Sequence, residues 1–427
     1  MLGIILGLIV LMVLAYIGWS IIWVAPIAAG VVALTGGLDL LDAYKDTYMG
    51  GFVGFAKAWF PVFLLGAIFG KLMEDSGMAR SVAVALTKLI GTKRAILGVV
   101  VSCAVLTYGG VSLFVVVFAV YPLALSLFRE ANINRKLIPG TVALGAFTFT
   151  MTALPGTPQI QNLIPMEYFE TDAMAAPILG ITAALVMGVG GYFYLRWREK
   201  QLAAAGEVYT EPEDTKIMDV GGSTPLFILS VLPLLTVLIT LNLFKWDIVT
   251  ALIAGIILIM LLNITKFKGF VKAINGGAIG SVTAIVNTSA AVGFGTVVKI
   301  VPGFEKLTEL LMGIKGNTLI SEAVAVNILA GATGSASGGM GIALEALGSK
   351  YYEIAIDTGM NPEAFHRVAS LASGGLDTLP HNGAVLTLLT ITGMSHRDSY
   401  KDIFVVAVVI PIIAVAVAIL MAAIGIN

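Results

Sequence analysis

Residues 376–389 read LDTLPHNGAVLTLL, so an acid, a proline, a histidine, an asparagine and a glycine directly precede a run of apolar residues. Proline has no backbone N–H, and its ring blocks continuous helical hydrogen bonding. An apolar segment with this sequence therefore cannot run through as one unbroken helix. The rest of the sequence indicates what this break contributes to function.

The composition places the chain in a lipid bilayer. Of its 427 residues, 58% are hydrophobic and 12% are charged, and the mean hydropathy is +0.96. That is more apolar surface than a soluble core needs. The net charge of −1 favours no nucleic-acid partner, and the single cysteine, Cys103, excludes an internal disulfide or a cysteine-based metal cluster. We expect neither a metal nor a cofactor.

Apolar runs close to the roughly 20 residues that cross a bilayer recur along the whole chain. The first run has no basic leader and no cleavage site, so we expect a retained span. The chain is therefore predicted to be an all-α polytopic membrane protein. The predicted spans are 2–18, 20–36, 55–75, 139–163, 175–195, 224–243, 248–264, 278–300, 366–391 and 403–426.

Two further apolar segments do not fit this scheme. Residues 95–128 form two half-length apolar runs on either side of a turn at 108–110, and residues 318–348 repeat the pattern around GATGSASGGMG. A glycine-rich turn is tolerated at membrane depth only where protein or a water-filled cavity surrounds it. Both segments are predicted to be re-entrant hairpins.

Basic residues orient the first hairpin. Lys93 and Arg94 precede it and Arg129 follows it, so both ends are predicted to be cytoplasmic. The second hairpin has no basic excess at its ends and is predicted to enter from outside. The hydrophilic segment 201–223 is predicted to be a cytoplasmic linker. Residues 165–173, which include Glu167, are then predicted to lie outside.

The two halves of the chain align with each other at a nearly constant offset. This agreement over most of both halves indicates an internal repeat. The matched landmarks are Phe69 with Phe294 (294 − 69 = 225), Thr107 with Thr333 (333 − 107 = 226) and Leu154 with Leu379 (379 − 154 = 225).

Each half contains five predicted spans and one hairpin, and an odd number of spans forces the two copies into opposite orientation. Inverted repeats of this kind are typical of secondary transporters. The predicted organisation is a first repeat at 1–200, the linker at 201–223 and a second repeat at 224–427.

In each repeat the span after the hairpin is interrupted, by LPGTPQIQN at 154–162 and by DTLPHNGA at 377–384. Helix ends at such breaks favour an anion, while hydroxyl and amide side chains read its substituents. Neither break contains lysine or arginine, which favours a small hydroxy acid. The candidate substrate-binding residues are Thr107, Tyr108, Gly109, Gly110, Thr152, Gly156, Thr157, Gln159, Gln161, Asn162, Thr333, Ser335, Ser337, Gly338, His381 and Asn382.

At these residues the sequence resembles the gluconate permease family of the ion transporter superfamily. The segments GKLMEDSGMA, TYGG, LPGTP, GSASGGMGIA and LPHNGAVLTLL carry the resemblance, which covers nearly the whole chain. It implies proton-coupled uptake of sugar acids and related hydroxy acids through the inner membrane. It also implies a scaffold domain and a mobile transport domain that works as an elevator, and we expect a homodimer.

The form LDTLPHNGAVLTLL, followed by SYKDIF, looks closer to the hydroxybutyrate-type members of that family. In gluconate members we expect a first break with histidine and proline, where this chain has TALPGTP. The expected substrate is therefore 3-hydroxybutyrate or a related small hydroxy-monocarboxylate, ahead of gluconate.

Two titratable residues of the second break are candidates for ion coupling. Asp377 and His381 lie in an intramembrane break, where such groups are costly and often functional. Each also has a structural interpretation, because Asp377 can bond amides freed by Pro380 and His381 can cap the broken helix. His366 and His396 are expected to be solvated at loop edges.

Other classes of protein remain as alternatives. Coupling to sodium is the alternative to protons, and a passive anion channel is the alternative to a symporter. An intramembrane hydrolase would need a nucleophile and a base, for which Ser337 with His381 is the tempting pair. The sequence has no HExxH or GxSxG context for it, and we predict no enzyme.

Overall fold

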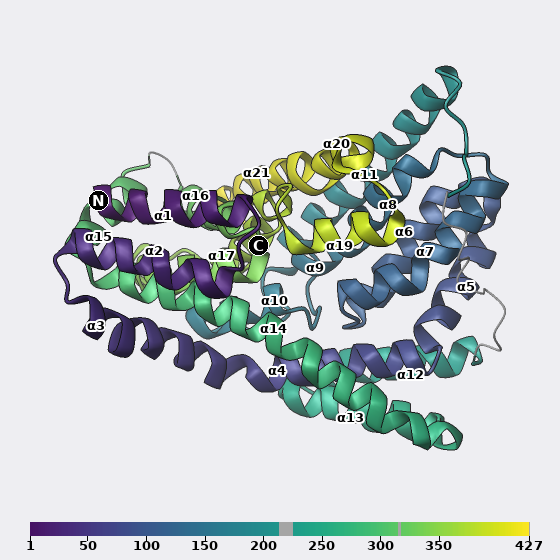
Figure 1. The fold of residues 1–427 in the computed structure, drawn as a ribbon, viewed down its shortest axis with the longest axis horizontal. Coiled ribbons are helices and arrows are strands. Elements are labelled where there is room, and N and C mark those ends of the chain that lie inside the picture. The colour runs from purple at the N-terminus through teal and green to yellow at the C-terminus, as the bar shows by residue number, and fades with distance from the viewer. Residues whose placement is uncertain (213–224, 315–316, 427) are drawn as a thin grey trace.

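The computed structural model describes residues 1–212, 225–314 and 317–426, and all regular secondary structure in these ranges is helical (Figure 1). Residues 213–223 of the predicted linker lie outside the described residues. The helices fall into two sets, one in each half of the chain.

The first half contains two apolar helices, a long helix, a helical hairpin and an interrupted segment before a second long helix. The helices are α1 (Leu2–Tyr16), α2 (Ile21–Gly36), α3 (Leu40–Asp42), α4 (Met49–Asp75), α5 (Met78–Ile90), α6 (Ala95–Tyr108), α7 (Leu113–Glu130), α8 (Ile138–Ala146), α9 (Phe149–Thr152), α10 (Ile160–Phe169) and α11 (Pro177–Ala204).

The second half repeats this order. Its helices are α12 (Phe227–Asn242), α13 (Ile248–Leu262), α14 (Phe267–Ile300), α15 (Gly303–Met312), α16 (Thr318–Thr333), α17 (Ala336–Thr358), α18 (Pro362–Ser373), η5 (Leu376–Thr378), α19 (Gly383–Thr392), α20 (His396–Phe404) and α21 (Ile410–Ala423).

Within the described residues, five continuous helical stretches are long and apolar enough to cross a bilayer. Several further apolar helices are shorter, among them α1, α2, α12 and α13. The five stretches are 40–75, 113–130, 177–204, 264–300 and 396–423.

Equivalent helices of the two halves begin at a nearly constant spacing. The starts of α1 and α12 differ by 227 − 2 = 225 residues, those of α5 and α15 by 303 − 78 = 225, and those of α8 and α18 by 362 − 138 = 224. Helix pairs in contact also repeat: α1 packs on α2 as α12 packs on α13, and α10 packs on α17 as α19 packs on α7. The arrangement agrees with the spacing found in the sequence.

The long helices α4 and α14 form the most extensive helix–helix contact and lie across one another in the lower part of Figure 1. A close backbone approach makes this contact possible. A Cβ atom on Gly277 of α14 would lie 2.7 Å from the Cα of Ile68 and 2.9 Å from the carbonyl oxygen of Ala67. Only glycine fits there, as in other small-residue contacts between membrane helices.

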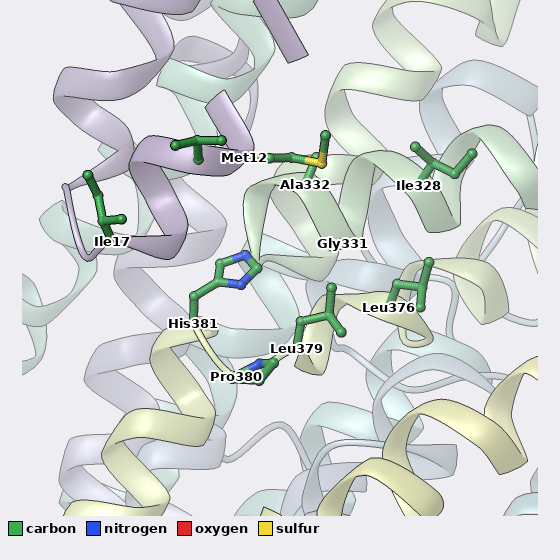
Figure 2. Close-up of a pocket in the computed structure, with 10 residues that line it drawn as sticks. Met12, Ile17, Ile328, Gly331, Ala332, Leu376, Leu379, Pro380 and His381 are labelled. Atoms are coloured by element: carbon green, nitrogen blue, oxygen red, sulfur yellow. The ribbon is translucent and has the colours of Figure 1, made fainter. Parts of the chain in front are cut away.

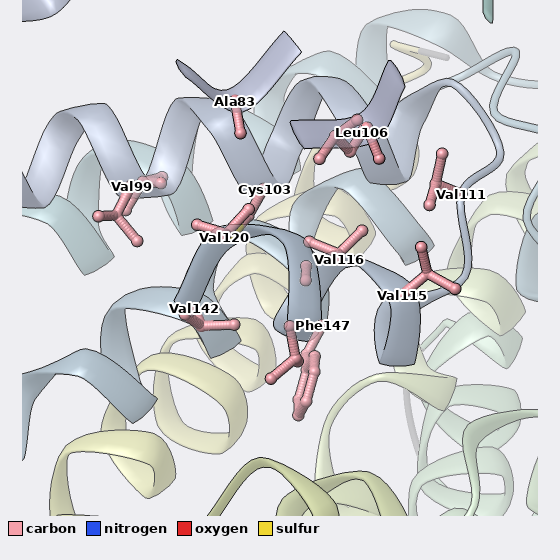
Figure 3. Close-up of a cluster of buried hydrophobic side chains, with 14 of the residues drawn as sticks. Ala83, Val99, Cys103, Leu106, Val111, Val115, Val116, Val120, Val142 and Phe147 are labelled. Atoms are coloured by element: carbon pink, nitrogen blue, oxygen red, sulfur yellow. The ribbon is translucent and has the colours of Figure 1, made fainter. Parts of the chain in front are cut away.

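The first hairpin packs through a buried aliphatic cluster. Cys103 of α6 lies among Val99, Val116 and Val120 from the hairpin and Val142 from α8, all essentially inaccessible to solvent (Figure 3). The thiol is free and buried, which agrees with its interpretation as a packed apolar side chain.

The structure corrects several predicted element bounds. The spans predicted to begin at 55 and 278 start at Met49 and Phe267, and the span predicted to end at 195 continues to Ala204. The extensions of α14 and α11 carry polar residues, so a search for continuous apolar runs shortens them, whereas residues 49–54 of α4 are apolar residues and glycine.

The helices α5 and α15 were not predicted. Each follows the long helix of its half, and both are amphipathic, with buried residues such as Met78 and Val82 recurring one turn apart on α5. Their polar residues lower the mean hydropathy below that of a span, and only the helical period reveals them.

The re-entrant prediction for α6 and α7 is tested by labelling. In a Cys103→Ala background, single cysteines at Arg94 and Arg129, both exposed, should react with a membrane-impermeant maleimide from the cytoplasmic side. The physical reason is that a hairpin returns its two ends to one membrane face. A cysteine at the exposed Glu167, predicted to lie outside, serves as the opposite-face control. Labelling of positions 94 and 129 from opposite faces would contradict the hairpin.

Candidate functional site

The first break, between α9 and α10, is held open by side-chain hydrogen bonds. Pro155 and Pro158 interrupt the helix, because neither has a backbone N–H to donate. Nδ2 of Asn162 donates to the carbonyl oxygens of Thr157 and Ala173, both at 2.9 Å. The first bond pairs a carbonyl group of the interrupted segment, and the second connects the break to the loop after α10.

The tip of the first hairpin, residues 107–112, is attached to this break. Oη of Tyr108 donates to the carbonyl oxygen of Pro155 at 2.9 Å. Nε2 of Gln159 donates to the carbonyl oxygen of Thr107 at 2.6 Å. The hairpin and the interrupted helix of the first half therefore form one connected unit.

The second break, between α18 and α19, is organised around Asn382. Its Oδ1 accepts from the backbone N–H of Val385 at 2.9 Å and caps α19. Its Nδ2 donates to the carbonyl oxygens of Asp377 and Gly334, both at 2.9 Å. Gly334 is the tip of the second hairpin, so each hairpin tip is bound to the break of its own half.

The ring of His381 packs against the second hairpin tip. A Cβ atom on Gly334 would lie 2.7 Å from Cδ2 and 2.8 Å from Nε2 of this ring, and the ring also interacts with the backbone of Gly331. Oδ1 of Asp377, in a side chain that is 3% exposed, has no hydrogen-bond partner among the described residues. The two candidate coupling residues therefore have different surroundings.

A cavity of about 450 Å³ borders the second break (Figure 2). His381 contributes a polar group, and the ring extends between the end of α1 and the α16 turn in the view of Figure 2. The other described lining residues are apolar, glycine or proline: Met12, Val13, Ile17, Ile328, Gly331, Ala332, Leu376, Leu379 and Pro380. Of the predicted site residues, His381 is the member that lines this cavity.

The first break contains a different feature, a group of buried polar atoms without hydrogen-bond partners among the described residues. They are Oγ1 of Thr107, Oγ1 of Thr157, Oε1 of Gln161 and Oδ1 of Asn242. Buried polar atoms usually have partners, so each unpaired one needs an explanation. Asn242 of α12 is connected to the break, because its Nδ2 donates to the carbonyl oxygen of Gly156 at 2.9 Å.

Asn242 was missed by reasoning from the sequence. It is the last residue of α12. The equivalent residue of the first half is Ile17, since 242 − 17 = 225, and Ile17 lies beside the second break. A polar residue at the end of an apolar helix is common, so the sequence carried no sharp signal for it. Its contact with Gly156 exists only in the tertiary structure.

The helix before the second break, α18, contacts the region of the first break. Oγ of Ser370 donates to the carbonyl oxygen of Thr152 at 2.7 Å. The fully buried guanidinium of Arg367 donates to Oδ1 of Asn162 at 2.8 Å and to the carbonyl oxygen of Ala175 at 2.7 and 3.1 Å. A charged residue inside a predicted span was the available signal for Arg367.

The histidines expected at solvated loop edges lie elsewhere. His366 is fully buried, with Nδ1 2.6 Å from Oγ1 of Thr171. His396 is half-buried, and its Nε2 lies 2.9 Å from the carbonyl oxygen of Pro380. Both expectations were wrong, because His366 lies inside α18 and packs against Thr171, while His396 begins α20 and lies against the second break.

The remaining candidates around the second hairpin tip bond mainly to their own hairpin. Oγ of Ser335 accepts from the backbone N–H of Gly338 at 3.1 Å and caps α17. Oγ1 of Thr333 donates within α16, and Oγ of Ser337 lies 3.3 Å from Oγ1 of Thr288 on α14. No group of three or more His, Cys, Asp or Glu residues that could hold a metal ion occurs in the described part of the chain.

Comparison with known proteins connects this architecture to transporters. A model of the GntP family permeases matches residues 1–244. The chain is 44% identical to the uncharacterized transporter YxjC of Bacillus subtilis across 95% of both sequences. It is 28% identical to the D-serine transporter DsdX of Escherichia coli over 199 residues, which are 46% of this chain and 42% of that relative.

The fold is similar to the crystal structure of the YdaH transporter of Alcanivorax borkumensis. The TM-score is 0.57 with 15% sequence identity, and the match covers 90% of this chain and 88% of that one. At this identity the likeness concerns the fold alone.

The contact between Gly334 and His381 is tested by two glycine substitutions. Gly334 and Gly359 both have positive φ, +59° and +71°, but a Cβ atom at Gly359 meets nothing within 4 Å. Alanine in this conformation costs about 1–2 kcal/mol at either site. Gly334→Ala also displaces the His381 ring, and we expect uptake in proteoliposomes to fall about tenfold or more, as for a displaced group worth about 1.4 kcal/mol. Equal uptake by the two folded variants would contradict a role for this contact.

Proposed function

The chain belongs to the GntP permease family, and we propose that it is a secondary active transporter that imports a small hydroxy-monocarboxylate together with protons. The family and the relatives named above are permeases and transporters rather than enzymes. With its apolar helices, the chain is a multi-pass membrane protein. The substrate, the coupling ion and the inner-membrane location belong to the proposal.

The group of unpaired polar atoms at the first break is the observation that carries the substrate proposal. Leaving a buried polar atom without a partner costs about 1–3 kcal/mol. Hydroxyl and amide groups at Thr107, Thr157, Gln161 and Asn242 would recover this cost by binding a hydroxylated ligand. An apolar or purely anionic ligand would leave several of them unpaired.

Helix ends supply the attraction for the carboxylate. The N-termini of α10 and α19 begin directly after the two breaks, and the partial positive charge of a helix N-terminus favours an anion there. Arg367 adds a full charge close enough to interact electrostatically with Tyr108. The guanidinium is occupied by Asn162 and Ala175, so it would attract the anion without holding it in an ion pair.

The relatives and the resemblance favour a small substrate. One relative is named a D-serine transporter, and serine is a three-carbon carboxylate with a hydroxyl group. Within this class, we propose 3-hydroxybutyrate or a related acid ahead of gluconate. The reason is the sequence of the second break, LDTLPHNGAVLTLL, which resembles that of hydroxybutyrate-type members.

An alternating-access mechanism is supported by the repeated layout. The constant spacing of helices and the repeated helix contacts agree with repeats at 1–200 and 224–427 joined by the linker at 201–223. With five spans and a hairpin in each copy, the copies would be inverted. We propose that the hairpins and broken helices form a transport domain that moves against a scaffold built on α4 and α14, in a homodimer.

Asp377 and His381 are the proposed coupling residues. Asp377 is buried with an unpaired oxygen beside the break, and a carboxyl group in such surroundings can change its protonation when a substrate anion arrives. His381 lies between the hairpin tip and the cavity. Binding of proton and substrate would then stabilise the same closed state of the second break.

The substrate proposal is tested by competition for uptake into vesicles. We expect 3-hydroxybutyrate to compete better than gluconate and at least about tenfold better than butyrate, because a site built for a hydroxyl group penalises its loss. Asn242→Leu should reduce the difference between hydroxybutyrate and butyrate in how strongly they inhibit uptake. Thr390→Val, at an exposed site on α19, should leave that difference unchanged. The idea fails if dicarboxylates compete better than every monocarboxylate.

The coupling proposal is tested in proteoliposomes with an imposed pH gradient, with and without sodium. The parent should accumulate substrate against its gradient, which a channel cannot do. Asp377→Asn and His381→Ala should abolish pH-driven accumulation but keep some substrate exchange, since exchange needs no net proton movement. Asp357→Asn, at an exposed carboxylate of α17, is the control. Full accumulation by both variants would eliminate these residues as the coupling site.

A further inference from the structure

Glu322, in the second hairpin, is an acid that the proposed function does not yet use. It lies in the first turns of α16 and is 0% exposed. Neither Oε1 nor Oε2 has a hydrogen-bond partner among the described residues. Its neighbours along the helix, Leu319, Ala323 and Val326, are buried apolar residues. We propose that Glu322 is a second proton-binding site of the transport cycle.

The surroundings of Glu322 provide no cation to neutralise it. The helices packed on α16 are α1, α15, α17, α18, η5 and α21. Of these, α1 and α21 carry no charged residue, and the charged residues of α15 are exposed. The buried titratable groups are Tyr351 of α17, His366 and Arg367 of α18, and Asp377 of η5.

Each of these buried groups is engaged elsewhere or is not cationic. Arg367 donates to Asn162 and Ala175, and His366 lies against Thr171. The hydroxyl of Tyr351 lies 3.0 Å from Oγ of Ser321 and is not cationic. A carboxylate with no cation and no donor is far less stable in apolar surroundings than the neutral carboxyl group. In this conformation Glu322 therefore holds a proton.

The position of Glu322 links this proton to the second break. Asn327 lies five residues further along α16, about 7.5 Å at the rise of an α-helix. Its Oδ1 accepts from the backbone N–H of Leu376 at 3.2 Å. Leu376 directly precedes Asp377, whose Oδ1 is also buried and unpaired. One helix thus connects two buried carboxyl groups of the second half.

The inference rests on the proposed proton coupling and adds a site to it. A movement of the second break that pulls on Asn327 also moves α16, and water reaching Glu322 would allow the carboxyl group to release its proton. Rebinding a proton restores the neutral group and the closed packing. The equivalent position in the first half is Leu97, since 322 − 97 = 225, so this site would operate in the second half alone.

Infrared difference spectroscopy tests whether Glu322 holds a proton. Spectra of the lipid-reconstituted parent, with and without 3-hydroxybutyrate, should contain the C=O stretching band of a protonated carboxyl group that responds to the ligand. Asp377 is also expected to contribute to this band, so Glu322→Gln, which preserves shape, should remove one component of it that Asp377→Asn leaves in place. Glu345→Gln, at an acid of α17 that accepts from Tyr168, should retain it. A spectrum in which Glu322→Gln removes no component of the band would overturn the proposal.

A transport measurement tests whether that proton moves. With a pH-sensitive dye inside proteoliposomes, the number of protons entering per substrate should be lower for Glu322→Gln than for the parent, while substrate exchange without a pH gradient is retained. An unchanged proton ratio in Glu322→Gln, despite loss of the infrared band, would make Glu322 a static carboxyl group and overturn the inference. Absence of proton movement in the parent itself would instead refute the proposed proton coupling, and this inference with it.

Discussion

Every backbone group freed at a membrane-depth break must find a partner inside the protein, and the rest of this structure depends on how that is done. Two asparagine amides meet the requirement in the same way. Asn162 and Asn382 each donate to the carbonyl oxygen five residues earlier, at Thr157 and Asp377. In lipid there is no water to replace these bonds, and each unpaired group costs several kcal/mol. The breaks are therefore fixed structural features.

Further bonds join each break to a hairpin and so connect the two into one hydrogen-bonded unit. Gln159 reaches the carbonyl of Thr107 in the first half, and Asn382 reaches that of Gly334 in the second. The donors come from different positions of the two breaks, although the connection is equivalent. The connection is equivalent in the two halves, while the side chains that make it have diverged.

This divergence separates the two breaks by polarity. Asn242 brings an amide to the first break, where the equivalent helix end brings Ile17 to the apolar cavity at the second. The second half instead contains the buried acids Glu322 and Asp377. If the proposals above hold, these differences divide the work between the breaks. The first break would bind hydroxyl groups, and the second would respond to protons.

Several features of the fold were predictable because they depend on covalent or local properties. Proline cannot donate to a helix, so TALPGTP and DTLPHNG predicted the two breaks, and the glycine-rich turns predicted the two hairpins seen as α6–α7 and α16–α17. The start of α14 and the amphipathic helices α5 and α15 were missed, because their polar residues hide a helix from a search for apolar runs.

The sequence by itself determined that this chain is helical and apolar, where its helices break, and that its halves share one spacing; these properties follow from local stereochemistry and composition. Only the tertiary structure decided which polar groups are paired. Arg367 finds Asn162, 205 residues away in the chain, whereas Glu322 and Oδ1 of Asp377 find no partner in the described residues. Pairing depends on distances between distant segments, and those distances are fixed only when the helices pack.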